Sequence, residues 1–251
     1  MSEHDDVLAV IDEGRFRTVF QPIYGLETRR VTAVEALTRF AGQGRPASPA
    51  HRFAQARALG LDVELELATL RRALASATRL PAGVSLSVNL SPRALLDVRA
   101  VLLLTRRQVG DLTVEITEQA TASGYPDLLR VRGQLRDMGI RVAIDDVGVS
   151  VASVRHVGWL APDVVKADLS LTHGLAARRS CRLLARYLLL AARRAGASVV
   201  AEGVETPAQL QAWRRLGADA VQGFLLAAPG PLEDALAASP LTPGAASDRH
   251  G

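Results

Sequence analysis

The stretch DLLRVRGQLRDMGIRVAIDD, residues 127–146, contains one complete unit of the pattern that decides the fold. Its first part has the apolar spacing of a helix, and Gly139 is placed to end that helix because glycine accepts the left-handed conformation. The short segment Arg141–Asp145 has an apolar centre typical of a buried strand. It ends on the acid Asp145, and a second acid, Asp146, follows directly. A helix that leads into such a strand is typical of an α/β fold with a parallel sheet.

The same unit recurs on both sides of this stretch. Further helices are predicted near Arg52–Ala77, Arg179–Ala195 and Pro207–Leu216, with Gly196 and Gly217 placed as stops after the last two. With Arg141–Asp145, eight strands are predicted, the others near Thr18–Tyr24, Val31–Thr38, Ser85–Asn89, Leu112–Ile116, Val164–Lys166, Ser198–Glu202 and Ala220–Gly223. A chain of 251 residues fits one large barrel or two small domains, and the unbroken alternation favours a single α/β barrel.

Composition excludes several classes of protein. The single cysteine, Cys181, rules out an intramolecular disulfide, and no zinc-binding Cys/His spacing occurs. The polar start Met1–Asp6 is unlike a signal peptide, and no apolar run is long enough to span a membrane. A cytoplasmic protein without membrane insertion is therefore expected.

The charge balance is mildly basic, with 30 basic against 26 acidic side chains and a net charge of +4. Aromatic residues make up only 4% of the chain and no nucleic-acid-binding motif occurs, so a nucleic-acid polymer is not expected as a partner. The arginine-rich segment Arg178–Arg194 is interpreted as an outer barrel helix with a solvated face, in preference to a membrane-surface or partner site.

Nearly every predicted strand ends on a polar side chain. These residues are Glu35, Asn89, Glu115, Asp145 with Asp146, Lys166, Glu202 and Gln222. The carboxyl ends of barrel strands converge on one face, where so many carboxylates repel one another unless a cation lies between them. All the candidate ligands are oxygens and no histidine lies at a predicted strand end, which favours Mg²⁺ or Mn²⁺ over zinc.

Five acids are enough to hold two metal ions, and two ions about 4 Å apart suit the cleavage of a phosphodiester. Lys166 is the only lysine of the chain and Asn89 the only asparagine. Lys166 is a candidate to orient hydroxide or offset phosphate charge, and Arg39 a candidate phosphate clamp.

Each of these residues also has a structural explanation. An acid at a strand end is usually solvated or caps a helix, as Asp146, Glu205 and Thr206 are placed to do. Lys166 and Asp168 are spaced for a plain ion pair. The joint occurrence on successive strands favours the shared site.

At these positions the chain resembles the EAL family of cyclic-di-GMP phosphodiesterases over roughly residues 15–232. The matching segments, in chain order, are Gln21-Pro22-Ile23, Glu35-Ala36-Leu37-Thr38-Arg39, Ser87-Val88-Asn89-Leu90-Ser91-Pro92, Glu115-Ile116-Thr117-Glu118, Asp145-Asp146, Lys166-Ala167-Asp168, Ala201-Glu202-Gly203-Val204-Glu205-Thr206 and Gln222-Gly223-Phe224. The resemblance implies a TIM-like (β/α)8 barrel with one antiparallel strand. It also implies a two-metal Mg²⁺ or Mn²⁺ site that linearises cyclic di-GMP to pGpG.

The resemblance also implies a role for each matching residue. One metal would be held by Glu35, Asn89, Glu115 and Asp145, and the second by Asp145, Asp146 and Glu202. Catalysis is implied for Lys166, at the attacking water, with Glu35 and Glu202. The dinucleotide would contact Gln21, Arg39 and Gln222, while Glu118 and Glu205 would support the surrounding loops.

The chain departs from the family pattern in two places. After the aspartate pair it reads Val147-Gly148-Val149-Ser150-Val151-Ala152-Ser153, where active members usually have Phe-Gly-Thr-Gly-Tyr-Ser-Ser. In the family this loop positions the aspartates and contributes to a homodimer interface, so the change bears on turnover and dimerisation. Arg57 stands where a glutamate is usual.

The leading interpretation is a metal-dependent cyclic-di-GMP phosphodiesterase of reduced activity, with an N-terminal lead-in over residues 1–14, a barrel domain over 15–238 and a flexible tail over 239–251. The first alternative is a catalytically weak or inactive cyclic-di-GMP receptor that acts through a protein partner. The second is an interaction domain that binds no nucleotide. The complete ligand set favours the enzyme, because a site freed from catalysis has no need of repelling carboxylates.

Overall fold

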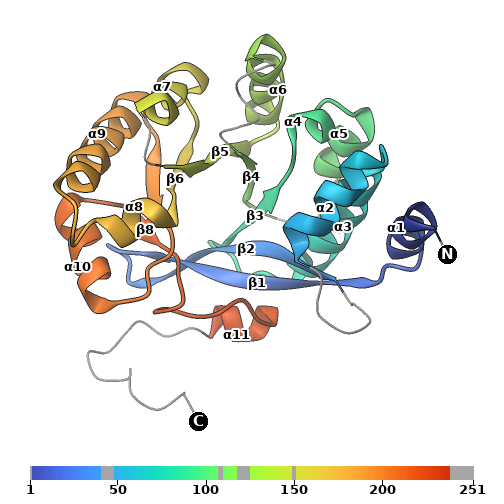
Figure 1. The fold of residues 1–251 in the computed structure, drawn as a ribbon, viewed down its shortest axis with the longest axis horizontal. Helices are drawn as coiled ribbons and strands as arrows, with labels where there is room; N and C mark the ends of the chain where they lie inside the picture. Colours follow the sequence, from blue (N-terminus) through green and yellow to red (C-terminus); the bar gives the residue numbers. More distant parts are fainter. Residues whose placement is uncertain (1, 41–47, 107–109, 118–124, 149–150, 238–251) are drawn as a thin grey trace.

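A computed structural model describes residues 2–40, 48–106, 110–117, 125–148 and 151–237. In it, strands β1 to β8 close into a barrel surrounded by helices (Figure 1). The strands are β1 Phe16–Gly25, β2 Arg30–Phe40, β3 Ser85–Asn89, β4 Leu112–Thr117, β5 Ile140–Val147, β6 Val164–Ala167, β7 Ser198–Ala201 and β8 Ala220–Val221. All eight predicted strands are present, so the expected α/β barrel is confirmed.

Strand β1 runs against both of its neighbours, and all the other pairs are parallel. The long β1–β2 hairpin pairs Gln21 directly with Glu35, and its register shifts between Ile23 and Tyr24. The expectation of one antiparallel strand is thus confirmed. Because β1 runs the opposite way, Gln21 reaches the strand-end face of the barrel from the middle of its strand.

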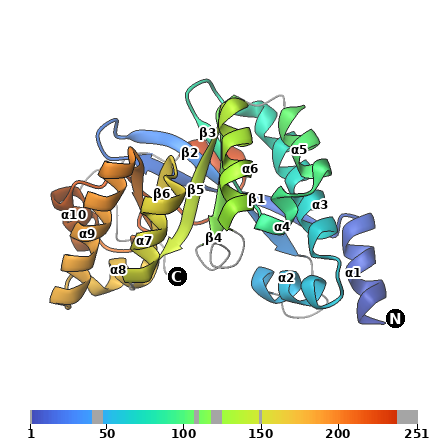
Figure 2. The same ribbon diagram turned by 90° about the horizontal axis from the view of Figure 1, so that it is seen from above.

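The helices lie outside the barrel, as Figure 2 shows from above. They are α1 Glu3–Asp12, α2 Pro49–Ala58, α3 Asp62–Ser76, α4 Pro92–Leu95, α5 Val98–Thr105, α6 Tyr125–Asp137, α7 Val151–Leu160, α8 Leu169–Gly174, α9 Arg179–Ala195, α10 Pro207–Leu216 and α11 Leu232–Leu236. Gly139, Gly196 and Gly217 have φ of 69°, 74° and 86°, which confirms them as helix stops.

The single helix predicted over Arg52–Ala77 is wrong, because the structure has α2 and α3 there instead. Gly60 between them has φ of 73°, a conformation that ends a helix. Six helices had no counterpart in the prediction: α1, α4, α5, α7, α8 and α11. Four of these, α4, α5, α8 and α11, have eight or fewer residues, too short to show a clear apolar period.

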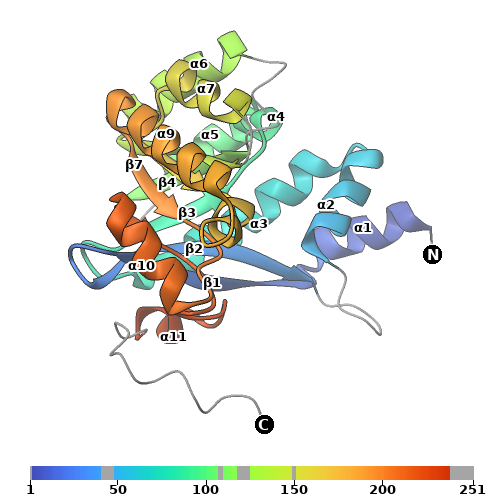
Figure 3. The same ribbon diagram turned by 60° about the vertical axis from the view of Figure 1, so that its left-hand side comes forward.

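Helix α1 occupies most of residues 1–14, the predicted lead-in, and packs against β1 and β2. Ser2 and Asp5 form a capping box at its start, and its buried Val7 and Val10 join a small core with Phe16 and Phe40. Figure 3 shows α1 beside α2 at one end of the β1–β2 hairpin.

Apolar packing fills two layers. The larger core lies between the sheet and its helices, and a small cluster of Ile23, Ala33, Ala143, Val164, Val200 and Ala220 fills the barrel interior. The polar side chains of the strand ends lie beyond this interior cluster, at the carboxyl ends of the parallel strands. Among the described residues, no helix is long and apolar enough to span a membrane.

Candidate functional site

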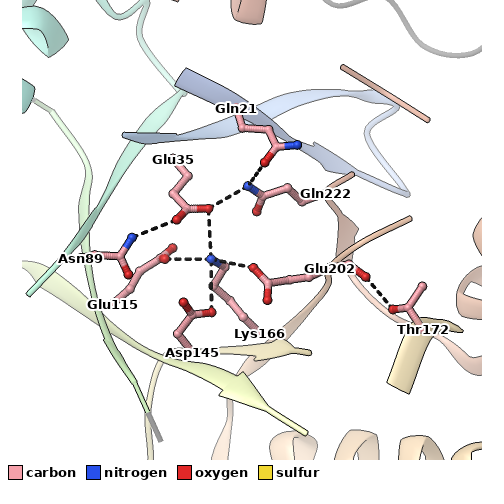
Figure 4. Close-up of polar contacts among 9 residues, drawn as sticks. All are labelled: Gln21, Glu35, Asn89, Glu115, Asp145, Lys166, Thr172, Glu202 and Gln222. Atoms are coloured by element: carbon pink, nitrogen blue, oxygen red, sulfur yellow. Dashed lines mark hydrogen bonds and ion pairs between the residues drawn. The ribbon is translucent and has the colours of Figure 1, made fainter. Parts of the chain in front are cut away.

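The polar side chains of the strand ends meet at one end of the barrel (Figure 4). Lys166 of β6 lies at their centre and is 1% exposed. Its ammonium nitrogen, Nζ, lies near one carboxylate oxygen from each of four residues: Glu115 at 2.8 Å, Glu202 at 2.8 Å, Glu35 at 3.1 Å and Asp145 at 3.3 Å. The plain ion pair with Asp168 that the sequence left open is not formed. The Asp168 carboxylate instead accepts the backbone N–H of Ser170 and caps α8.

Glu35 is held by two amide side chains, those of Asn89 and Gln222, as well as by Lys166. Asn89 Nδ2 donates to Glu35 Oε1 at 2.9 Å, and Gln222 Nε2 donates to Glu35 Oε2 at 2.7 Å. Gln222 Nε2 also donates to Gln21 Oε1 at 3.0 Å, and Gln21 Nε2 donates to the carbonyl of Ala227. Gln222, at the end of β8, therefore joins Glu35 of β2 to Gln21 of β1. These amides orient the Glu35 carboxylate.

A group of three acids offers a metal site. Oxygens of Asp145, Asp146 and Glu202 lie within 4.8 Å of one another. Asp146 has φ of 59°, in the left-handed region that aspartate tolerates better than most residues. That turn at the end of β5 breaks the regular alternation, so two consecutive acids both reach the strand-end face.

Burial and mutual repulsion perturb the acids strongly. Burial raises the pKa of Glu115 to about 8. Lys166 opposes this shift, whereas repulsion from Glu35 and Asp145 adds to it. Burial likewise raises the pKa of Glu202 well above its usual value. Both shifts favour the protonated carboxyl in the metal-free protein, because one ammonium cannot neutralise all the acids.

Other groups of the cluster shift for related reasons. Burial and repulsion from Asp145 raise the pKa of Asp146 to about 6. Burial disfavours the Glu35 carboxylate, but Lys166 and the amides of Gln222 and Asn89 outweigh it, and the pKa of Glu35 is lowered. Burial likewise disfavours the Lys166 ammonium, yet the surrounding carboxylates raise the pKa of Lys166 well above normal.

The residues present fit a divalent metal ion. All ligand atoms on offer are carboxylate or amide oxygens, the donors that Mg²⁺ and Mn²⁺ prefer. Asp145 Oδ1 and Gln222 Oε1 are buried and accept no hydrogen bond, although Asp145 Oδ1 lies within electrostatic range of Lys166. Unsatisfied buried oxygens are costly, and a cation beside the acids would satisfy the Asp145 oxygen.

Two grooves open on either side of Glu35. One, of about 240 Å³, is lined by Gln21, Glu202, Gln222 and Phe224 among others. The other, of about 440 Å³, is lined by residues that include Arg39, Asn89, Asp145 and Asp146. Arg39 lies on the same face of β2 as Glu35, since they are four residues apart on a strand.

The predicted supporting residues are placed less centrally. Glu205 lines the smaller groove, and its carboxylate lies 3.6 Å from His173 Nε2. Thr206 caps α10 through a capping box with Gln209, as the sequence allowed. Glu118, Val149 and Ser150 lie outside the described residues. Arg57 is exposed, and its Nε lies 4.0 Å from Asp62, a peripheral contact on α3.

Two residues that hold the site in place were missed by the sequence analysis. Glu66 of α3 accepts the backbone N–H of Ser91 at 2.7 Å, two residues after Asn89, and burial raises its pKa. Thr172 of α8 donates to the carbonyl of Glu202 at 2.6 Å and accepts the indole N–H of Trp213. Both lie on outer helices, where an acid or a threonine carries no signal in the sequence pattern.

The EAL domain family model matches residues 4–229, which is most of the chain. The chain belongs to the EAL domain family. This membership confirms the resemblance read from the motifs, and relatives in the family are named cyclic di-GMP phosphodiesterases.

Two curated relatives of this EAL domain are each 32% identical to it. One is an uncharacterized protein, y4lL, of Sinorhizobium fredii, matched over 90% of this chain. The other is the cyclic di-GMP phosphodiesterase NbdA of Pseudomonas aeruginosa, matched over 85%. The chain spans 28% and 29% of the length of these relatives, respectively.

Solved EAL structures share its fold. The PaMucR phosphodiesterase, in complex with c-di-GMP, superposes with a TM-score of 0.84 at 25% identity and covers 93% of this EAL domain and 99% of that chain. The FimX EAL domain of Xanthomonas citri, also in complex with c-diGMP, gives a TM-score of 0.81 at 21% identity, covering 92% of this chain and 94% of that one. The second likeness establishes the fold alone.

Proposed function

We propose that this EAL domain is a metal-dependent phosphodiesterase that hydrolyses cyclic di-GMP to pGpG. The observation that carries the proposal is the ring of four carboxylates around Lys166, with Asp146 beside it, at the carboxyl ends of the barrel strands. A structural core has no use for so many buried acids, whereas a two-metal site requires them.

The ligands divide between two Mg²⁺ or Mn²⁺ positions. Glu35, Asn89, Glu115 and Asp145 would hold the first, and Asp145, Asp146 and Glu202 the second. Asn89 suits this role because its amide nitrogen is engaged by Glu35, which leaves the amide oxygen as the ligand. Bound divalent ions supply charge that lowers the pKa of a water and neutralises the phosphodiester.

Hydrolysis consumes one water molecule for each pGpG released. The water oxygen forms a bond to phosphorus, the bond from phosphorus to the ribose 3′ oxygen breaks, and the proton balance closes at the new 3′ hydroxyl. Lys166 is the residue proposed to orient the attacking water. Its buried ammonium stays charged, because the carboxylates around it raise its pKa, so it acts as a hydrogen-bond donor to water and phosphate rather than as a base.

Residues of the two grooves are proposed to make the other contacts with the substrate. Gln21 and Gln222 in the smaller groove and Arg39 in the larger are proposed to contact the dinucleotide, and Glu118 and Glu205 to support the loops around it. Grooves on both sides of Glu35 suit a substrate with two nucleotide halves. Arg39 offers a planar donor pair for phosphate oxygens.

The wider expectations from the sequence remain proposals of the same kind. They are a barrel domain over residues 15–238, a cytoplasmic location, a homodimer and a complex with a protein partner.

Turnover and binding can be measured separately. Purified protein with cyclic di-GMP and Mg²⁺ or Mn²⁺ is expected to release pGpG, and Glu35→Ala to abolish the release, while Glu27→Ala, at an exposed acid of the β1–β2 hairpin, leaves it unchanged. Binding is measured in Ca²⁺ by calorimetry. Tight binding without product over hours would exclude the enzyme and favour a cyclic-di-GMP receptor. Absence of binding would favour an interaction domain that binds no nucleotide.

A further inference from the structure

Helices α9 and α10 form a flank of the barrel with a one-sided charge. Between Asp168 and Glu202 the chain has no acidic residue, and this segment holds six arginines, at positions 178, 179, 182, 186, 193 and 194. Helix α10 adds Arg214 and Arg215 and has no acid of its own. Figure 3 shows α9 and α10 side by side on the outside of the barrel.

The exposed face of α9 combines arginines with large apolar side chains. At 100° per residue, Leu183, Tyr187 and Leu190 fall within a stripe about 60° wide. They are 55%, 44% and 47% exposed, although each could have been polar at no cost to the core. Arg179, Arg186 and Arg194 lie on the same side of the helix and are exposed. Arg179 precedes the apolar residues, Arg194 follows them and Arg186 lies between them. We call this surface, formed by Arg179, Leu183, Arg186, Tyr187, Leu190 and Arg194, the α9 stripe.

The charge of the α9 stripe is uncompensated. In the part of the chain that the structure describes, no ion pair joins its arginines to a carboxylate. Two neighbouring arginines bond only to carbonyls: Arg182 to Leu175 and Ala176, and Arg193 to Gly217 at the end of α10. A surface patch of guanidinium groups without acids creates a positive potential that attracts an anionic partner.

The mixture of side chains selects among anionic partners. A phosphate backbone of nucleic acid satisfies arginines but gives Leu183 and Leu190 no apolar environment. A second copy of the same face is disfavoured by repulsion between like charges. A peptide helix docks in a groove, whereas α9 presents a convex surface. A lipid headgroup layer offers anionic phosphates and an apolar boundary a few ångströms apart.

We propose that the α9 stripe docks this protein on an anionic lipid surface. The arginines lie against the headgroup phosphates, while Leu183, Tyr187 and Leu190 enter the boundary between headgroups and acyl chains. Tyrosine suits this depth because its ring is apolar and its hydroxyl stays hydrated. The docking is peripheral, since the opposite face of α9 remains packed on the barrel through Ala185, Leu188 and Ala192.

The docking surface is separate from the phosphodiesterase site. No residue of α9 or α10 lines either groove beside Glu35. Lipid binding and turnover are therefore measured independently, and the failure of one leaves the other untouched.

The test is co-sedimentation of the full chain with vesicles. Vesicles of phosphatidylcholine containing about one third phosphatidylglycerol are expected to bind the protein at low salt, and vesicles of pure phosphatidylcholine to leave it in solution. Binding to the anionic vesicles weakens as salt rises, because screening shortens the reach of the arginines. The triple variant Arg179→Gln, Arg186→Gln, Arg194→Gln is expected to bind at least about a hundredfold more weakly, from roughly fivefold per arginine.

Two further variants separate charge from packing. The triple variant Arg71→Gln, Arg130→Gln, Arg136→Gln removes the same charge from exposed positions of α3 and α6 and is expected to keep most of the binding. Leu183→Ser with Leu190→Ser is expected to lose about tenfold while keeping its salt dependence. Equal losses in the two arginine variants, or no binding to anionic vesicles at low salt, would overturn the proposal. Tighter binding to an oligonucleotide or a polyglutamate peptide than to the vesicles would overturn it too.

Discussion

The ammonium nitrogen of Lys166 lies 2.8 Å from a carboxyl oxygen of Glu115, and both side chains are 1% exposed. Three further carboxylates share the same ammonium nitrogen. Among the described residues, Lys166 is thus the one cation at the centre of the acid cluster, and in the metal-free protein it limits the repulsion between the acids. The same side chain therefore connects the stability of the fold with the chemistry of the site.

Replacing Lys166 by methionine is expected to destabilise the metal-free protein by about 3–5 kcal/mol, the usual result of leaving buried charges without their partner. Added Mn²⁺ is expected to recover more stability in this variant than in the unaltered protein, because the ions then supply all the compensating charge. Urea unfolding with chelator and with Mn²⁺ measures both effects. An unfolding free energy unchanged in chelator would show that the acids are neutralised by protons alone.

The metal-free protein is expected to lose stability as the pH rises. Glu115 has a pKa of about 8 in the folded protein against an ordinary value of 4.5, so folding takes up a proton. Stability from this group is complete below pH 4.5 and is lost as the pH rises through about 8. Urea unfolding across this range in chelator measures the slope, and Glu115→Gln should flatten it. An equally steep slope in that variant would assign the effect to other groups.

Metal affinity is expected to change in the opposite direction with pH. A ligand must lose its proton before it binds a cation. Glu115, with a pKa of about 8, holds its proton at neutral pH, whereas Asp146, with a pKa of about 6, loses its proton as the pH rises through about 6. Mn²⁺ affinity should rise by up to about tenfold per pH unit for each proton released. Calorimetry in two buffers of different ionisation enthalpy counts those protons. An affinity independent of pH between 6 and 8 would contradict the raised pKa values.

Glu66→Ala is expected to act on the site from outside it. The change leaves the buried N–H of Ser91 without its acceptor, at a cost of about 1–3 kcal/mol, and frees the segment that carries Asn89. Mn²⁺ affinity should fall by about tenfold or more, as it does when supporting hydrogen bonds of ligands are removed. Glu64→Ala, on the same helix, removes only an exposed pair with Arg99 and should cost less than about 1 kcal/mol. Equal effects of the two changes would exclude the positioning role.

Thr172→Val is expected to loosen Glu202. Its hydroxyl links the Glu202 carbonyl to the indole of Trp213, and an isosteric valine leaves both groups unpaired. A destabilisation of about 1–3 kcal/mol is expected, together with a loss of Mn²⁺ affinity. Thr172→Ser, which keeps the hydroxyl, should restore both quantities. Failure of the serine variant to do so would point to the lost methyl group instead.

The strands could be predicted because their signals are local. Short apolar runs that end on polar residues gave all eight strands within about two residues, and glycine stops gave the ends of three helices. The boundary between α2 and α3 was missed, since Gly60 within a helical pattern reads equally well as a tolerated glycine. Helices α4, α5, α8 and α11 were missed because eight residues or fewer give too few turns for a period to show.

The sequence by itself determined the barrel and the set of candidate oxygen ligands, because strand periodicity and the chemistry of carboxylates are properties of single segments. Only the tertiary structure decided that Lys166 lies among four acids, that Gln222 joins Glu35 to Gln21, and that Glu66 and Thr172 support the ligands from outer helices. These contacts join residues far apart in the chain. Their distances and burial follow from barrel closure, which no local pattern encodes.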